Sequence, residues 1–150
     1  MKKIIINNLT EVKNLAIKTA ENFAGGNVVA LIGNLGAGKT TFTQFLAKAL
    51  GVTQTVNSPT FNIIKTYKIK NNKSCPPASK LPIKSFTHVD AYRLRSVEDL
   101  RVIGVEEYFN DKNNITIIEW ADKVQTILPK NATVIKISLM KNGQRRFEIK

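Results

Sequence analysis

The chain has 150 residues, of which 43% are hydrophobic, and this is enough for one domain with a buried core. A single cysteine, Cys75, excludes an internal disulfide, and a single histidine, His88, argues against a His-rich metal centre. No apolar run is long enough to span a membrane, and polar residues follow the first few residues too early for a signal peptide. We therefore expect a soluble, cytoplasmic protein that does not act on membranes.

The charge is basic and unevenly distributed. Lys and Arg number 23 against 11 acidic residues, giving a formal net charge of +12. Residues 22–89 contain no acidic residue, and a second basic group, Lys141, Arg145, Arg146 and Lys150, lies near the end of the chain. Such a field attracts polyanions, but a lysine-rich composition on a solvated surface explains it equally well, so both interpretations stay open.

The first half of the chain predicts two helices around one buried strand. Thr10 is the expected N-cap of the first helix, which ends before the glycine pair at 25–26. The continuous apolar run at 28–32 is typical of a strand buried on both faces. An amphipathic helix over 42–50 follows, after a glycine-rich segment.

The middle of the chain predicts two strands, 61–69 and 85–90, joined by a long polar segment. This segment is rich in Lys and Pro, so we expect residues 68–84 to form an exposed loop insertion. Ser96 and Asp99 have the spacing of a capping box and predict the start of another helix.

The last third predicts a further buried strand at 115–118, followed by a short helix to Leu128. Two strands, 133–139 and 145–149, then flank a turn at 141–143. Alternating strands and helices favour an α/β layer fold with antiparallel pieces at the edge, and the whole chain is expected to form a single domain.

A phosphate-binding loop stands between the strand at 28–32 and the helix that follows. Residues 33–40, GNLGAGKT, match G-x-x-x-x-G-K-[ST] without a mismatch. Glycines let several backbone N–H groups point at phosphate oxygens, lysine adds a cation, and the threonine hydroxyl can bind Mg2+. The motif predicts binding of ATP and Mg2+ in a P-loop NTPase-like three-layer fold with a mixed sheet and antiparallel edge strands. The nucleotide-contacting residues are expected to be Gly33, Asn34, Leu35, Gly36, Ala37, Gly38, Lys39, Thr40 and Thr41.

Two acidic residues compete for the second metal-binding position. Asp90 and Glu119 each follow an expected strand, on the side where open α/β sheets place their ligands. Glu119 follows the more apolar strand and is the better choice from the residues alone. We expect at least one of them to reach the metal with Thr40.

Several motifs occur together in a specific order. They are GNLGAGKTTF at 33–42, NSPTF at 57–61, HVDAYRL at 88–94, EDL at 98–100, GVEEYF at 104–109 and IEW at 118–120. This set resembles the TsaE family, the bacterial ATPases of tRNA threonylcarbamoyladenosine synthesis, over nearly the whole chain. Two departures are Asn34, where the family usually has Asp, and a longer segment at 68–84.

The resemblance implies a role for individual residues. Lys39 and Thr40 keep their P-loop roles, Thr60 lies near the γ-phosphate and Mg2+, Asp90 is needed for hydrolysis, and Glu119 is associated with the metal. Trp120 is expected close to the nucleotide, with Thr10 near the adenine and Arg146 as a weaker nucleotide candidate. His88 is expected to be an oriented structural residue and not a general base.

The resemblance also implies the biological role. Such a protein is a Mg2+-dependent ATPase that supports threonylcarbamoylation of the tRNA adenosine next to the anticodon, acting with a TsaB–TsaD complex. It reaches tRNA through that complex and does not act on DNA. One alternative is a P-loop small-molecule or nucleoside kinase, although no arginine-bearing lid segment is evident. Another is a nucleic-acid-binding module that uses the Lys-rich stretch at 65–84, where few aromatic residues are available for stacking.

Overall fold

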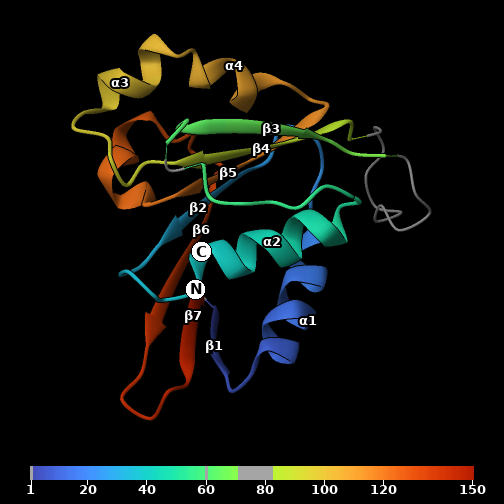
Figure 1. Ribbon diagram of the computed structural model, residues 1–150, viewed down its shortest axis with the longest axis vertical. Coiled ribbons are helices and arrows are strands. Elements are labelled where there is room, and N and C mark those ends of the chain that lie inside the picture. The colour runs from blue at the N-terminus through green and yellow to red at the C-terminus, as the bar shows by residue number, and fades with distance from the viewer. Residues whose placement is uncertain (1, 60, 71–82) are drawn as a thin grey trace.

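The computed structural model describes residues 2–59, 61–70 and 83–150. Strands and helices alternate along most of the chain (Figure 1). They are β1 (Lys2–Ile6), α1 (Leu9–Ala20), β2 (Val28–Ile32), α2 (Lys39–Ala49), β3 (Ile64–Lys68), β4 (Ser85–Asp90), α3 (Val97–Val102), α4 (Val105–Asn110), β5 (Asn114–Glu119), the 3-10 helix η1 (Ala121–Ile127), β6 (Thr133–Leu139) and β7 (Arg145–Ile149). None of the helices in these described ranges is long and apolar enough to cross a membrane.

The strands form one seven-stranded mixed sheet in the order β1-β7-β6-β2-β5-β4-β3. The four central strands, β6, β2, β5 and β4, run parallel. At the edges, β7 and β1 on one side and β3 on the other pair antiparallel. Parallel strands are normally buried on both faces, and every residue of β5 is buried here.

Helices cover both faces of the sheet and make three layers (Figure 1). One apolar core lies beneath α1 and α2 and contains the ring pair Phe42–Phe147, with centroids 5.6 Å apart. A second core lies beneath α3, α4 and η1 on the opposite face. The expected P-loop NTPase-like fold, with its mixed sheet and antiparallel edge strands, is confirmed.

The start of α1 differs from the expectation. Asn8, not Thr10, is the N-cap: its backbone is extended, and its side chain accepts a hydrogen bond from the backbone N–H of Glu11 at 3.0 Å. Thr10 therefore lies exposed within the first turn. Both residue types make good caps, so composition alone could not choose between them. The capping box of Ser96 and Asp99 is confirmed at the start of α3.

Two elements were not predicted and one begins later than expected. β1 is short and mostly exposed, with only Ile6 buried, so its apolar run is stabilised by pairing with the distant β7. α4 has only six residues, which leaves little room for a helical pattern. The strand expected over 61–69 begins at Ile64, because Ile63 has a φ of 62° and turns the chain after Pro59.

The expected loop insertion lies mostly outside the described residues, which omit 71–82. The two described ends of this segment are partly buried and hydrogen-bonded to each other, unlike an exposed loop. The N–H of Ile69 donates to the carbonyl of Lys84 at 2.8 Å, and Ile69 and Ile83 are buried. The pairing of β3 with β4 thus continues past Lys68, and the expectation of an exposed segment over the whole of 68–84 is wrong at these apolar positions.

Candidate functional site

The segment between β2 and α2 brings the chain close to neighbouring backbone, where only glycine fits. A Cβ on Gly33 would lie 2.4 Å from the carbonyl oxygen of Ile137 in β6. Gly38 caps α2 with a φ of 102°, in the left-handed region that L side chains rarely adopt. The two glycines let the loop curl over the N-terminus of the 11-residue α2, whose first N–H groups have no partners within the helix.

Lys39 is buried within this loop and is held by backbone oxygens. Its Nζ donates to the carbonyls of Gly33 at 2.7 Å and Asn34 at 3.0 Å, and lies 3.7 Å from the ring centroid of Trp120. Burial lowers the pKa of Lys39, and the nearby carboxylates of Glu119, Asp122 and Asp90 oppose that shift. The ammonium is therefore a poorly solvated cation, held in place by contacts that a phosphate group could replace.

Glu119, at the end of β5, receives hydrogen bonds from three sides. The hydroxyl of Thr40 donates to its Oε2 at 2.8 Å, and that of Thr43 shares its one proton between Oε1 of Glu119 at 3.3 Å and the carbonyl of Lys39 at 3.0 Å. His88 Nε2 lies 2.8 Å from the same Oε1. The carboxylate and the histidine ring are almost completely buried, at 2% and 0% exposed. The contact with His88 thus orients the carboxylate of Glu119.

Asp90 lies directly opposite Glu119 in the register of β4 and β5 but has different partners. Its Oδ2 accepts a hydrogen bond from the hydroxyl of Ser58, and its Oδ1 accepts one from the N–H of Tyr92 at 3.0 Å. Asp90 therefore connects the strand ends to the segment before Pro59, whereas Glu119 connects them to the phosphate loop.

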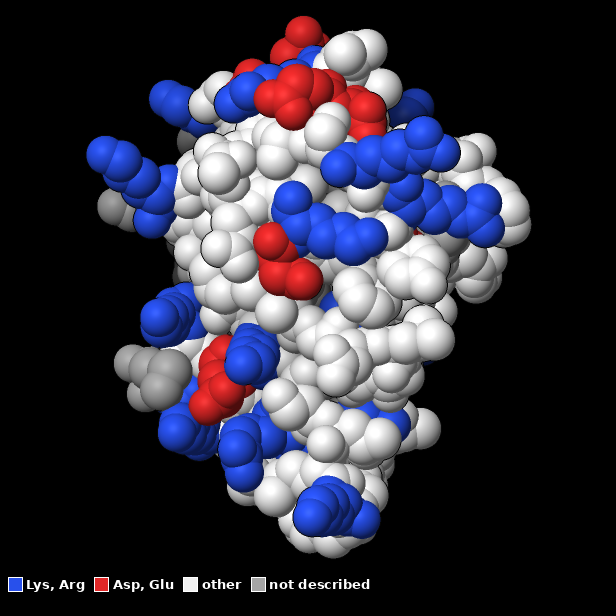
Figure 2. Space-filling view, turned by 90° about the vertical axis from the view of Figure 1, so that its left-hand side faces the viewer, with Lys and Arg blue, Asp and Glu red and all other residues white. Residues whose placement is uncertain are grey.

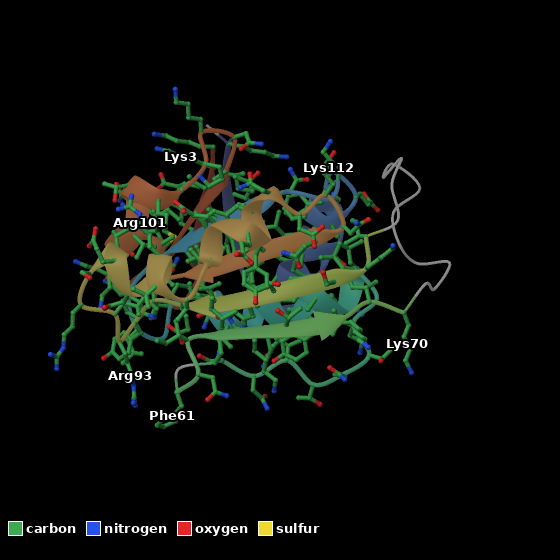
Figure 3. All side chains as sticks on the ribbon, turned by 90° about the horizontal axis from the view of Figure 1, so that it is seen from above. Lys3, Phe61, Lys70, Arg93, Arg101 and Lys112 are labelled. Carbon is green, nitrogen blue, oxygen red and sulfur yellow. The ribbon has the colours of Figure 1, made fainter. Side chains whose placement is uncertain are left out.

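Aromatic side chains border the site on the β4 and β5 side. The rings of Tyr92 and Trp120 are 4.9 Å apart, and Trp120 has a φ of 60°, which is uncommon for a large residue and turns the chain sharply after β5. Further out, the guanidinium of Arg93 lies 4.4 Å from the ring centroid of Phe61, which is 84% exposed. Figure 3 shows this pair at one corner of the molecule, with Lys70 at the far end of the same edge.

These segments enclose a pocket of about 420 Å³. Figure 2 views the molecule from the side toward which the β2 arrow points in Figure 1. Basic side chains are spread over this face, and a group of acidic side chains lies at the end covered by α3 and α4. The pocket is lined by Leu35, Gly36, Gly38, Lys39, Thr40, Thr41, Ser58, Asp90, Tyr92, Glu119, Trp120 and Arg145.

Most of the residues expected at the site lie here. Gly33, Asn34 and Ala37 belong to the same loop and contribute backbone oxygens, two to Lys39 and one to Arg145. Thr10 and Arg146 do not line the pocket: Thr10 is exposed on α1, and Arg146 lies beside the turn after β6. Thr60 lies outside the described residues.

Three lining residues had not been assigned a role from the sequence. Ser58 and Tyr92 stand within the motifs that were noted, but their contacts with Asp90 depend on the tertiary structure. Arg145 could have been found by strand alternation. Side chains alternate along a strand, so Arg145 shares a face with Phe147, which packs on α2, and Arg146 points to the other face.

The donor set fits a nucleotide with a magnesium ion. The hydroxyl of Thr40 and the carboxylates of Glu119 and Asp90 are oxygen ligands, which Mg2+ prefers. Lys39 and the N-terminus of α2 fit the negative charge of phosphates. Among the described residues, no group of three or more His, Cys, Asp and Glu side chains is arranged to hold a metal by itself, so phosphate and water oxygens would complete the ligand set.

The sheet order, the loop between β2 and α2, and the acidic residues at the strand ends define a protein with a P-loop NTPase-like fold. The sequence matches the family model described as threonylcarbamoyl adenosine biosynthesis protein TsaE over residues 6–147. The chain therefore belongs to the TsaE family, whose role is in the biosynthesis of threonylcarbamoyladenosine in tRNA.

Individual relatives agree with this assignment. The chain is 37% identical to the tRNA threonylcarbamoyladenosine biosynthesis protein TsaE of Bacillus subtilis, over 93% of this chain and 79% of the relative. It is 33% identical to the protein of the same name from Rickettsia bellii, over 97% of this chain and 92% of the relative. The crystal structure of Bacillus subtilis YdiB superposes with a TM-score of 0.74 at 32% identity, covering 97% of this chain and 82% of that chain.

Proposed function

We propose that this protein is a Mg2+-dependent ATPase that supports threonylcarbamoylation of the tRNA adenosine next to the anticodon, together with a TsaB–TsaD complex. The observation that carries the ATPase proposal is the contact between the hydroxyl of Thr40 and Glu119 at 2.8 Å. It joins the phosphate loop to a buried carboxylate at the end of the neighbouring parallel strand. A hydroxyl and a carboxylate at this spacing are oxygen donors that could hold one Mg2+ ion.

Different residues would bind the nucleotide and support its hydrolysis. The ammonium of Lys39 would exchange its contacts with the Gly33 and Asn34 carbonyls for contacts with phosphate oxygens. Thr40 and Glu119 would hold Mg2+, which when bound offsets the charge that builds up between the β- and γ-phosphates. Asp90, fixed by Ser58 and the backbone of Tyr92, would orient the water that attacks the γ-phosphate.

Hydrolysis releases ADP and inorganic phosphate and leaves no modified small molecule. We therefore propose that the energy of ATP is used on a protein complex. The pocket of about 420 Å³ is lined by the phosphate loop, by Asp90 and Glu119, and by residues that contact the loop or Asp90.

The test measures phosphate release from ATP by the isolated chain and then with the TsaB–TsaD pair present. We expect slow, Mg2+-dependent release alone, and repeated formation of threonylcarbamoyladenosine only when all three proteins and ATP are present. Lys39→Ala is the control for activity from contaminants. Phosphate release by Lys39→Ala at the wild-type rate would contradict the ATPase proposal, and full tRNA modification without this chain would contradict the role in the complex.

A further inference from the structure

The basic residues near the end of the chain are divided between the two faces of the sheet. Arg145 reaches the phosphate loop, so Arg146, the next residue of β7, points to the opposite face. Lys136 of β6 lies on that opposite face as well, because Ile135 and Ile137 on either side of it are buried in the core beneath α1 and α2. The basic group noted in the sequence therefore contributes to a surface away from the nucleotide pocket.

This opposite face of the sheet is open to solvent over β1, β7 and β6. The core beneath α3, α4 and η1 draws its buried strand residues from β2, β4 and β5 instead. Lys3, Lys136 and Arg146 are exposed on the three remaining strands. Figure 2 shows basic side chains gathered toward the lower end of the molecule, where the turn between β6 and β7 lies in Figure 1.

The register arranges this surface, which we call the open sheet face, in two rows across three strands. One row consists of Lys3, Glu148 and Lys136, and the next of Ile5, Arg146 and Ser138. Neighbouring strands are about 4.8 Å apart, and the two rows are about 7 Å apart, because they are two residues apart along each strand. The cations of both rows therefore lie close together on one surface.

Two of these cations have no acidic partner. The one acidic residue of the two rows, Glu148, has its Oε1 3.6 Å from Nζ of Lys3. Among the residues that the structure describes, neither Lys136 nor Arg146 forms an ion pair. Their charges are therefore available to an anion that approaches the open sheet face.

A hollow of about 460 Å³ lies beside Arg146, where the sheet meets the turn after β6. It is lined by Ser138, Leu139, Met140, Lys141, Asn142 and Arg146. A hydroxyl, an ammonium, an amide and a guanidinium thus supply hydrogen-bond donors around one space. Charged donors of this kind suit phosphate oxygens, and a guanidinium can donate two hydrogen bonds to one phosphate.

The chemistry of the open sheet face favours a nucleic acid backbone over an acidic protein. Neither row contains an aromatic residue, although aromatic residues are enriched at the centres of protein interfaces and stack on bases in sequence-specific RNA recognition. Contacts from Lys and Arg to phosphates need no such residue and do not depend on base sequence. The role of the family in tRNA modification identifies RNA as the polyanion in the same process.

We propose that the open sheet face binds the phosphate backbone of tRNA directly, with Lys136, Lys141 and Arg146 as the main contacts. This inference goes beyond the proposed function, in which the chain reaches tRNA through a partner complex. None of these three residues lines the nucleotide pocket, so binding of RNA and binding of ATP use separate surfaces of the molecule.

The experiment measures the fluorescence anisotropy of a labelled, unmodified tRNA transcript titrated with the full chain at several salt concentrations, without nucleotide. The test variant is Lys136→Gln with Arg146→Gln. Each phosphate contact contributes about 0.7 to 0.9 to the slope of log Kd against log salt, so we expect the slope to fall by about 1.5. The matched control is Lys13→Gln with Lys18→Gln, which removes the same charge from exposed positions of α1 on the other face of the sheet and should leave the slope unchanged.

Three results would overturn the proposal. Wild type that does not bind the transcript at low salt would exclude direct binding, and an equal loss of slope in both double variants would assign binding to net charge alone. Polyglutamate of matched charge that binds as tightly as the transcript would indicate an acidic protein as the partner instead.

Two further measurements keep these results interpretable. If thermal unfolding shows that the double variant is not folded, Lys136→Gln and Arg146→Gln are tested singly, and each should lower the slope by about 0.8. Phosphate release from ATP should be the same in wild type and in all variants. Wild type that binds the transcript but does not hydrolyse ATP would contradict the proposed function and leave this inference standing.

Discussion

The pocket has two halves that are built in different ways. The loop half, residues 33–41, is continuous in sequence. Within it, Lys39 donates to the carbonyls of Gly33 and Asn34, and Gly38 caps α2. The rim half, which comprises Ser58, Asp90, Tyr92 and Arg145, is assembled from three distant segments. Glu119 joins the halves, because it accepts hydrogen bonds from Thr40 and Thr43 of α2 while lying opposite Asp90.

The difference suggests a division of labour. A continuous loop at a helix N-terminus is sufficient to bind phosphates, since its donors are backbone groups in one fixed conformation. Hydrolysis needs groups around the far side of the γ-phosphate, and these come from other strands. Substitutions in the loop half should therefore abolish binding, whereas substitution of Asp90 in the rim half should affect hydrolysis more than binding.

The largest effect is expected for Lys39→Ala. Loss of the buried cation should weaken Mg-ATP binding by about 100-fold or more, because several charge-assisted contacts disappear together. Trp120 fluorescence measures it, and Lys48→Ala is the matched control, since Lys48 is exposed in the last turn of the same helix. Equal ATP affinities of Lys39→Ala and Lys48→Ala would contradict the assignment of phosphate binding to the loop half.

The two carboxylates provide the next test. Glu119→Gln should shift the Mg2+ midpoint of hydrolysis to higher concentration, because the amide loses the charge that holds the ion. Asp90→Asn should lower the hydrolysis rate about 100-fold and leave the Mg2+ midpoint and ATP affinity near wild type, as expected for loss of a positioned acid–base group. A metal midpoint that moves in Asp90→Asn and not in Glu119→Gln would reverse the assignment.

A smaller effect is expected at Thr43, which does not line the pocket but donates to Glu119. Thr43→Val removes this donor while keeping the shape, and it should slow hydrolysis about 3- to 10-fold, in line with the loss of one hydrogen bond. Thr43→Ser keeps the hydroxyl and should stay near wild type. Loss of activity in both variants alike would indicate a packing defect and contradict a role in holding the carboxylate.

The smallest expected effect is on the pH dependence of the stability of the protein without nucleotide. Burial lowers the pKa of Lys39, so the folded state loses this proton at a lower pH than the unfolded chain does. The unfolded state then binds more protons between the two pKa values, and stability should rise with pH across that window. Denaturant unfolding of wild type and Lys39→Met over alkaline pH measures it. An identical pH dependence in both proteins would show that Lys39 titrates normally.

Local patterns predicted the regular parts of this molecule well. The continuous apolar runs of β2 and β5, the capping box of α3 and the hairpin of β6 and β7 all agree with the structure. The errors occurred where local signals were equivalent or weak. Asn8 and Thr10 are both good caps, and β1 is stabilised by its pairing with β7 at the other end of the chain.

The sequence by itself determined the phosphate loop, because GNLGAGKT encodes a backbone conformation within eight residues, between a buried strand and a helix. It also identified Glu119 and Asp90 as residues at strand ends. Only the tertiary structure decided which donors each carboxylate receives, and that Arg145 and not Arg146 faces the loop. The physical reason is register: a shift of one residue along a strand moves a side chain to the other face of the sheet, and register depends on strands far apart in sequence.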